Sequence, residues 1–233
     1  MLKDKTFLAI IPARAGSKRL PKKNKLIFAN KPLIAWSIEA AKMSKYIDEI
    51  VVSSDDKDIL AIAQEYDVKS LYRPEELSDD TTSTTDVIQH ILKNIKKDFD
   101  YIVLLQPTSP LRDHKDINNA IELLIKKDAD SIISVCEVGH PPFWSNTLPE
   151  NKNMNNFLNE DILNKRSQDF KKYYRLNGAI YIIDKNKFLK TKNFFLKQNS
   201  FAYEMSQEKS IDIDSKLDFQ IASQLFKILK EEA

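Results

Sequence analysis

The sequence predicts an α/β fold in which a mostly parallel sheet is covered by helices on both faces. Runs of apolar, often β-branched residues of strand length alternate along the chain with segments of helical period. The strand runs are apolar throughout, which is typical of parallel strands buried on both faces. The 233 residues suffice for a self-contained core, and 42% hydrophobic with 30% charged residues excludes disorder, collagen and coiled coil as whole-chain descriptions.

Four strands are expected before residue 138, where apolar runs are bounded by charged or turn-forming residues. They are Phe7–Ile11, Ile50–Val52, Tyr101–Leu105 and Ile132–Val135. Helices are expected between them, where apolar residues recur at helical spacing after caps such as Pro32 and Ser83. Their apolar stripes are Leu33, Ile34, Ile38 and Ala41, then Ile59, Leu60 and Ala63, then Val87, Ile88, Ile91, Leu92 and Ile95, and finally Ile117, Ala120, Ile121 and Leu124. In such a fold, ligands bind at the carboxyl ends of the strands.

The pattern is interrupted over residues 139–172, which are rich in Pro, Asn and Asp and show no sustained period. So long an irregular insertion is usually functional, and its scattered apolar residues predict an arm that packs on another subunit or closes over a ligand. The strand pattern returns at Ala179–Ile183 and Phe201–Met205, before a final helix with the stripe Leu217, Ile221, Leu225 and Ile228. We therefore expect residues 1–138 and 173–233 to form one α/β domain, with 139–172 inserted into it.

Composition narrows the function classes. Thirty-six basic against 34 acidic residues leave a formal net charge of +2, too small to indicate a dedicated nucleic-acid binder. The single Cys136 cannot form an internal disulfide, and no run of about 18 apolar residues could cross a membrane. The first residues do not resemble a signal peptide, so a cytoplasmic protein is expected. Three glycines exclude a multi-glycine dinucleotide fingerprint, and the three histidines form no catalytic-triad or zinc pattern.

A basic stretch follows the first expected strand. Residues 12–24 contain five Lys or Arg residues around Gly16 and Ser17. A polyphosphate needs several converging donors, which the backbone amides near Gly16 and Ser17 and the flanking cations supply. The stretch is not a Walker loop. A solvated basic loop or a weak nucleic-acid patch would explain the charge alone, but the position at a strand's carboxyl end favours phosphate binding.

Two aspartates in the segment Ser210–Asp214 form a second motif. In an extended backbone Asp212 and Asp214 lie on one face, and the apolar residue between them turns away. Paired carboxylates suit Mg²⁺, which takes one or two carboxylates together with substrate phosphates. Alternatively, Asp214 caps the C-terminal helix, which would explain one aspartate but not its partner.

Two polar turns complete the candidates. Gln106 follows the strand Tyr101–Leu105 in a proline-stiffened turn and can both donate and accept hydrogen bonds. Arg175 and Asn177 precede the strand Ala179–Ile183 and suit a carboxylate or hydroxyls, with a simple turn as the alternative.

Five segments follow one another over almost the whole chain: Arg14 to Asn24, Arg73 to Leu77, Leu105 to Arg112, Asn177 to Tyr181 and Ser210 to Asp214. Together they resemble the acylneuraminate cytidylyltransferases, or CMP-sialic acid synthetases. The resemblance implies a Rossmann-like nucleotidyltransferase that transfers CMP from CTP to the anomeric hydroxyl of a nonulosonic acid, with Mg²⁺ present and pyrophosphate released. It also implies that residues 139–172 form a homodimer interface and reach the neighbouring active site.

The resemblance also assigns roles to single residues. It implies nucleotide binding by Arg14, Ser17, Lys18, Lys23, Asn24, Arg73 and Thr84, the last where the family usually has serine. It implies that Arg14 and Lys23 stabilise charge on the α-phosphate and pyrophosphate. Asp212 and Asp214 would hold the metal, and Asp212 would assist deprotonation of the sugar hydroxyl. The implied sugar-site residues are Gln106, Arg166, Gln168, Arg175, Asn177, Tyr181, Phe194 and Phe195. For the two phenylalanines a place in the core is the alternative.

Three positions depart from the family pattern. Arg19 and Leu176 replace a common glycine and a common proline, and neither change removes a phosphate ligand. Trp144 stands where synthetases for ordinary sialic acid often carry lysine. This favours an acceptor with an additional acylamino group, such as legionaminic acid, a sugar of bacterial surface glycans.

The sequence leaves two alternative functions open. One is a 3-deoxy-manno-octulosonate cytidylyltransferase, a family that typically continues into Gly-Lys-Pro where this chain has Lys22-Lys23-Asn24. The other is a non-catalytic nucleotide- or RNA-binding homologue, which the presence of both Asp212 and Asp214 disfavours.

Overall fold

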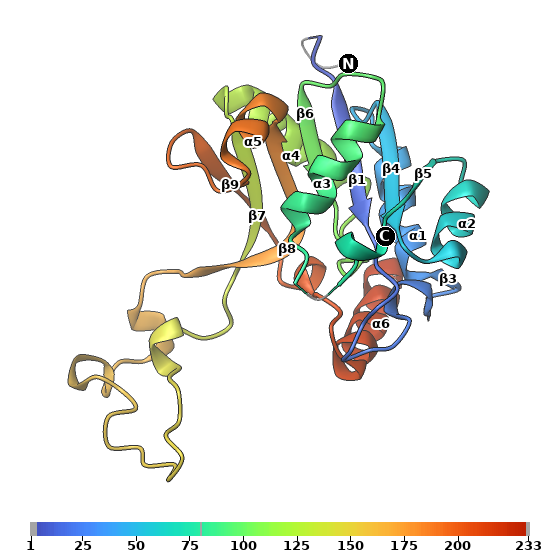
Figure 1. Cartoon of the computed structure of the whole chain (residues 1–233). Helices are drawn as coiled ribbons and strands as arrows, with labels where there is room; N and C mark the ends of the chain where they lie inside the picture. The colour runs from blue at the N-terminus through green and yellow to red at the C-terminus, as the bar shows by residue number, and fades with distance from the viewer. Residues whose placement is uncertain (1–3, 80, 232–233) are drawn as a thin grey trace.

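In the computed structural model, which describes residues 4–79 and 81–231, seven strands form one sheet in the order β5-β4-β1-β6-β8-β7-β9 (Figure 1). Strand β8 is antiparallel to its neighbours β6 and β7, and the other pairs are parallel. The strands are β1 (Phe7–Pro12), β4 (Glu49–Ser54), β5 (Lys69–Tyr72), β6 (Tyr101–Leu104), β7 (Ser131–Glu137), β8 (Tyr174–Asp184) and β9 (Ser200–Met205). A separate short hairpin pairs β2 (Ile27–Phe28) with β3 (Lys31–Pro32). The predicted α/β fold with a mostly parallel sheet is confirmed.

Helices cover both faces of this sheet. One face carries α1 (Leu33–Met43), α2 (Lys57–Glu65) and α4 (His114–Lys127), and the other carries α3 (Thr84–Asn94) and α5 (Lys185–Thr191). The side chains of β1 alternate between the faces: Phe7, Ala9 and Ile11 pack with the first group, Leu8 and Ile10 with the second. All five are buried, which explains their continuous apolar run. None of the described helices is long and apolar enough to cross a membrane.

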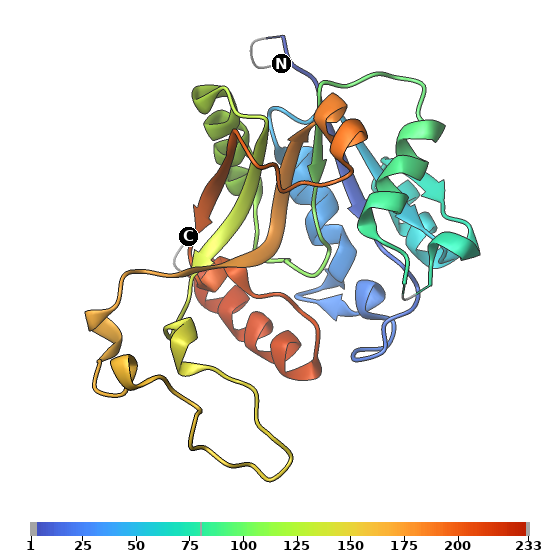
Figure 2. The same ribbon diagram turned by 60° about the vertical axis from the view of Figure 1, so that its left-hand side comes forward.

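The C-terminal helix α6 (Lys216–Glu231) lies at the lower end of the sheet in Figures 1 and 2. Its buried Ala222 packs in a small core with Phe28 of the β2–β3 hairpin, Leu33 of α1 and Ile213. Because Ile213 belongs to this core, the segment before α6 is held beside the carboxyl ends of the strands.

The sequence expectation missed strands β2, β3 and β5 and helix α5, and it placed the start of β8 too late. Strand β5 was not predicted, because it is a four-residue edge strand with half-exposed side chains and needs no apolar run. Helix α5 was not predicted, because in its seven residues only Phe188 is buried. Strand β8 begins at Tyr174, five residues before the expected start, since its first three residues are exposed and Asn177 and Gly178 interrupt the apolar run.

The pairing of β7 with β8 is irregular opposite Ser134, where the four residues Asn177–Ile180 of β8 face one residue of β7. The Ser134 hydroxyl accepts a hydrogen bond from the Ile180 amide at 2.8 Å. Gly178 has a φ of 74°, in the left-handed region that glycine tolerates, and a Cβ there would lie 3.4 Å from Oε1 of Gln106. The irregularity thus brings β8 close against the turn that follows β6.

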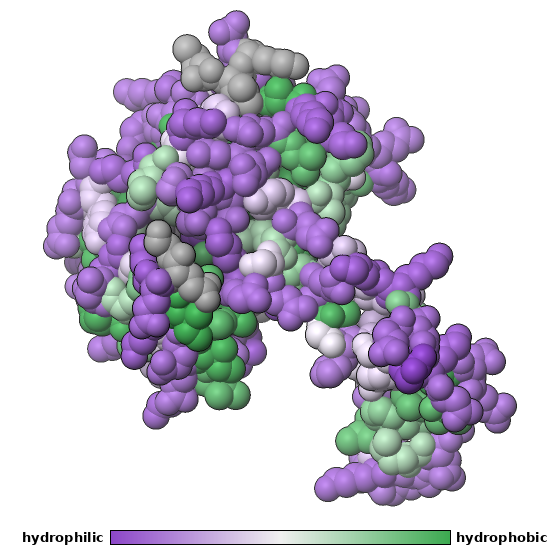
Figure 3. Space-filling view, turned by 180° about the vertical axis from the view of Figure 1, so that it is seen from behind, coloured by the Kyte–Doolittle hydropathy of each residue, from purple (hydrophilic) through white to green (hydrophobic). Residues whose placement is uncertain are grey.

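Residues 139–172, here called the arm, leave the sheet between β7 and β8 and extend away from the body (Figures 1 and 2). At its base the ring centroids of Phe143 and Tyr173 are 5.1 Å apart. Leu148 and Leu163 are exposed, and Figure 3 shows apolar side chains gathered on one face of the arm. An exposed apolar group of this kind is typical of a surface that contacts a partner.

Candidate active site

A cavity of about 520 Å³ lies at the carboxyl edge of the sheet. Its walls come from the loop after β1, the segment between β5 and α3, the turn after β6 and the segment before α6. Ligands of parallel sheets bind at this edge, because the strand ends and their loops converge there. Of the residues singled out from the sequence, nine line the cavity: Arg14, Ser17, Lys18, Lys23, Asn24, Arg73, Thr84, Gln106 and Asp214.

The basic loop after β1 is held in place by hydrogen bonds to its backbone. The Asn24 side-chain amide, 8% exposed, donates to the carbonyl of Arg14 at 3.1 Å. The Ala15 amide donates to Oδ1 of Asp55 at 2.9 Å. Asp55 was not predicted from the sequence, although it directly follows β4 and so carries the same carboxyl-end signal. Because its backbone is fixed, the loop can present several cations to one anionic ligand.

The two aspartates have different surroundings. Asp214 pairs with Nη2 of Arg19 at 2.5 Å and with Nζ of Lys23 at 2.8 Å. Asp212 is hydrogen-bonded by the Thr108 side chain, yet burial raises the pKa of its carboxyl above the usual range, helped by the charge of Asp214. Its Oδ1 is buried and has no hydrogen-bond partner among the described residues. One carboxylate thus binds the basic loop, and the other keeps a free acceptor.

The capping of α6 does not involve the Asp214 side chain. Asp218 accepts hydrogen bonds from the amides of Asp214 and Ser215, at 3.1 and 2.7 Å, and the Ser215 hydroxyl accepts from the Asp218 amide at 3.3 Å. This reciprocal arrangement is a capping box. The Asp214 carboxylate is therefore directed to the basic loop and not to the helix end.

Arg73 is a buried cation at the cavity wall, directly after β5. It is 4% exposed, and its Nε and Nη2 have no hydrogen-bond partner among the described residues. Asp55 lies 3.7 Å away, too far for a hydrogen bond, and burial lowers the pKa of Arg73. A buried guanidinium with unused donors at a cavity wall suits a planar ligand that carries acceptors. Thr84 lines the same wall as the first residue of α3.

Aromatic side chains gather beside Asp212, outside the cavity lining. Tyr181 is half-buried, and burial raises its pKa, with a further contribution from the Asp212 charge. Its ring centroid lies 5.6 Å from that of Phe194 and 6.3 Å from that of Phe195. Phe194 is buried among core residues, whereas Phe195 is 49% exposed. The core alternative therefore describes Phe194, and Phe195 remains accessible.

Asn177 and Arg175 of β8 contact the aspartate segment, not the cavity. Asn177 is 2% exposed, and its amide nitrogen donates to Oγ of Ser210 at 2.9 Å. Its Oδ1 accepts from the Ala179 amide at 3.2 Å and lies 2.6 Å from Oγ of Ser134. Nη2 of Arg175 donates to the Ser210 carbonyl at 3.0 Å. Both side chains thus hold the residues that precede Asp212.

Two predicted sugar-site residues belong to the arm. Arg166 pairs with Asp169 at 3.2 Å, and Gln168 lies in the same short 3-10 turn. The structure brings neither residue to the cavity lining found within the described chain. Trp144 is also in the arm, with its ring 6.0 Å from that of Phe170.

The aspartate pair fits a magnesium ion. Among the described residues no group of three or more His, Cys, Asp or Glu side chains gathers to hold a metal without a substrate. Mg²⁺ needs no such group, because it commonly takes one or two carboxylates and completes its shell with phosphates and water. The unpartnered, buried Oδ1 of Asp212 supplies a ready oxygen ligand beside Asp214.

Comparisons with known proteins agree with this geometry. A family model described as "Cytidylyltransferase" matches residues 8–232. An Escherichia coli protein named N-acylneuraminate cytidylyltransferase is 38% identical over 93% of this chain, which spans about half (51%) of that relative's length. A Legionella pneumophila protein named CMP-N,N'-diacetyllegionaminic acid synthase is 36% identical and matches over 97% of this chain and 98% of its own length.

Among solved structures, CMP:2-keto-3-deoxy-manno-octonic acid synthetase complexed with CTP superposes with a TM-score of 0.72. It covers 96% of this chain and 99% of its own, at 17% sequence identity. At that identity the likeness shows a shared fold.

Proposed function

Because the chain belongs to the cytidylyltransferase family, we propose that it transfers CMP from CTP to the anomeric hydroxyl of a nonulosonic acid and releases pyrophosphate. The observation that carries this proposal is the cavity itself, which is lined by the basic loop, the buried Arg73 and Asp214, with the unpartnered Asp212 two residues before Asp214. We place the reaction in the cytoplasm, where CTP is available.

In this proposal the nucleotide lies along the basic loop. Arg14, Lys18 and Lys23, with Ser17, bind the triphosphate, and Asn24 fixes the loop through the Arg14 carbonyl. The buried Arg73 donates to acceptors of the cytosine, with Thr84 nearby. Phosphate oxygens then replace Asp214 as the partners of Lys23, which frees Asp214 for the metal.

The transfer step is an in-line displacement at the α-phosphorus. The sugar oxygen forms a bond to phosphorus while the bond to the pyrophosphate oxygen breaks, and Asp212 accepts the hydroxyl proton. Arg14 and Lys23 stabilise the charge that develops on the α-phosphate and the leaving group. Mg²⁺, bound by Asp212 and Asp214, would neutralise phosphate charge and orient the triphosphate.

For the acceptor we propose a site beside Asp212 formed by Gln106, Tyr181 and Phe195, with Phe194 behind it, while Arg175 fixes the adjacent aspartate segment through the Ser210 carbonyl. Identities of 38% and 36% to relatives named for different sugars do not choose between those sugars. Trp144 stands where synthetases for ordinary sialic acid often carry lysine, and this favours legionaminic acid as the acceptor. Since Trp144 lies in the arm, its influence on the pocket would come through a partner subunit.

The first test is pyrophosphate release with CTP and Mg²⁺ on N-acetylneuraminic, legionaminic, pseudaminic and 3-deoxy-manno-octulosonic acids. We expect turnover that requires the sugar acid and stops with EDTA, and a kcat/KM for legionaminic acid at least about tenfold above that for N-acetylneuraminic acid. A preference for N-acetylneuraminic acid would refute the sugar assignment alone. CTP binding without turnover on any of the four acids would support a non-catalytic binding protein instead.

We further propose that the arm forms a homodimer and brings Arg166 and Gln168 to the partner's active site. The exposed apolar side chains of the arm support this, since they have no cover within the described chain. Sedimentation should give a dimer of the 27.0 kDa chain, and Leu163→Glu should shift it to monomer with loss of turnover. Leu189→Glu on exposed α5 is the matched control and should remain a dimer. A wild-type monomer with full activity would contradict the proposal.

A further inference from the structure

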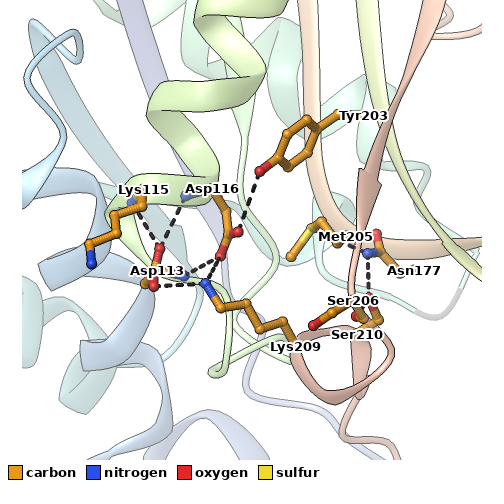
Figure 4. A network of polar contacts seen from close by, with 9 residues as sticks. All are labelled: Asp113, Lys115, Asp116, Asn177, Tyr203, Met205, Ser206, Lys209 and Ser210. Atoms are coloured by element: carbon orange, nitrogen blue, oxygen red, sulfur yellow. Dashed lines mark hydrogen bonds and ion pairs between the residues drawn. The ribbon is translucent and has the colours of Figure 1, made fainter. Parts of the chain in front are cut away.

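Lys209 is clamped between the carboxylates of Asp113 and Asp116 at the N-terminus of helix α4 (Figure 4). Its Nζ donates to Oδ2 of Asp113 at 2.8 Å and to Oδ2 of Asp116 at 3.0 Å. Asp113 is the N-cap of α4 and forms a capping box with Asp116, so both carboxylates are already fixed by the helix. Tyr203 of β9 adds a hydrogen bond from its hydroxyl to Oδ1 of Asp116 at 3.4 Å. Lys209 is therefore tied to a rigid element.

The segment that follows Lys209 carries the aspartates and is tied at two more points. Ser210 is held by the Asn177 amide of β8 at 2.9 Å (Figure 4), and the Ile213 amide donates to the Thr108 carbonyl at 2.8 Å. Lys209 is three residues from Asp212, a span of at most about 10 Å of extended chain. A shift of Lys209 would therefore also change the position of Asp212.

The two carboxylates that bind Lys209 also act on Arg112, which contacts the Gln106 turn on another wall of the cavity. This guanidinium is 1% exposed, and the charges of Asp116 and Asp113 partly offset the burial that lowers its pKa to about 10. Its Nη2 donates to Oγ of Ser37 at 2.7 Å and approaches the Gln106 carbonyl at 3.4 Å. The two carboxylates thus lie between a cation on the aspartate segment and a cation under the Gln106 turn.

The energetics favour a geometric role over a stabilising one. Lys209 is 26% and Asp116 9% exposed at their side chains, so both ions lose hydration. The attraction within such a pair roughly offsets the cost of taking both charges out of water, so its net effect on stability is small. What the pair does supply is one defined placement of the chain, which a reaction sensitive to shifts of about 1 Å requires.

We propose that Lys209 is a positioning residue that holds Asp212 and Asp214 at the spacing needed for metal and triphosphate, by anchoring their segment to the N-terminus of α4. The inference rests on the proposed function, because it assumes that the aspartate pair acts on a metal–nucleotide complex. In this proposal Lys209 itself does not contact the substrate.

The test compares two variants, Lys209→Met and Lys209→Arg, with the control Lys45→Met. The control removes the exposed ion pair between Lys45 and Glu122, and Glu122 lies on helix α4. Mn²⁺ affinity in the presence of CTP, measured by electron paramagnetic resonance without any sugar, is the readout that does not depend on turnover. Lys209→Met should weaken Mn²⁺ binding and lower kcat by about 10-fold or more, with the KM for CTP within about threefold. Lys209→Arg should restore most of both, and Lys45→Met should match wild type.

Hydrogen exchange should show faster exchange of the segment 206–214 in Lys209→Met. If that variant does not fold, Lys209→Met with Asp113→Asn takes its place, since it removes the lysine together with one of its two carboxylate partners and keeps an N-cap acceptor. Mn²⁺ affinity and kcat within twofold of wild type in the folded variant would overturn the inference. A wild-type protein that turns over no sugar, but loses Mn²⁺ affinity on Lys209→Met, would refute the proposed function and leave the inference standing.

Discussion

Asp212→Asn is expected to lower kcat by roughly 10²- to 10⁴-fold, because the substitution removes both a metal ligand and the proton acceptor of the transfer step. The protein should fold normally. Burial disfavours the charged Asp212 carboxylate, as its raised pKa shows, so the neutral amide should leave the free energy of unfolding unchanged or higher. Steady-state pyrophosphate release and urea unfolding measure the two effects separately.

A matched control is Asp98→Asn, which removes an exposed carboxylate paired with Lys185 before the amino end of β6, at the opposite edge of the sheet. It should keep wild-type turnover. Full activity in Asp212→Asn would contradict both roles assigned to this aspartate, whereas a loss of activity accompanied by unfolding would mean that the carboxylate is structural.

Lys23→Met is expected to lower kcat/KM by roughly 10²- to 10³-fold, the effect typical of removing one donor to developing charge. The Lys23 ammonium is mostly buried at the cavity wall, where an electrostatic contact is stronger than in water. Asp214 retains Arg19 as a partner, so the loop should keep its conformation. Initial rates over a range of CTP concentrations would give kcat and KM separately.

Lys22→Met is the control for this substitution, since Lys22 is the exposed neighbour of Lys23 in the same loop. It should change kcat/KM by less than about threefold, through the general field of the loop alone. Equal losses in the two variants would show that the loop acts by summed charge, and that Lys23 has no specific place at the phosphate.

The sequence was sufficient to predict the parts of the fold that are buried on both faces. The run Phe7–Ile11 is apolar because alternate residues enter two different cores. Edge strand β5 and helix α5 were not predicted from the sequence. The side chains of β5 are only partly buried and α5 buries a single residue, so neither element has a clear apolar pattern. The direction of β8 could not be deduced, because it depends on the path of the arm and not on any local pattern.

The site was predictable from the carboxyl-end rule for Arg14 and Gln106, whereas Arg73 follows the unpredicted strand β5 and was implied by the family resemblance alone. The role of Lys209 could not be predicted from the sequence, because its partners Asp113 and Asp116 lie more than 90 residues away and resemble ordinary helix caps. Asn177 shows the converse case: its side chain was expected at the sugar, yet the described chain uses it to hold Ser210.

The position of β8 has a consequence for the cooperativity of folding. Strands β5, β4, β1 and β6 form one ladder, β7 and β9 form another, and β8 alone joins the two in the described sheet. The pairing of β1 with β6 closes a loop over residues 13–100, and the pairing of β6 with β8 closes one over residues 105–173, so both depend on contacts distant in sequence. Because β8 also carries Asn177 and Gly178, the catalytic edge is complete only when the two ladders are joined into a single cooperative unit.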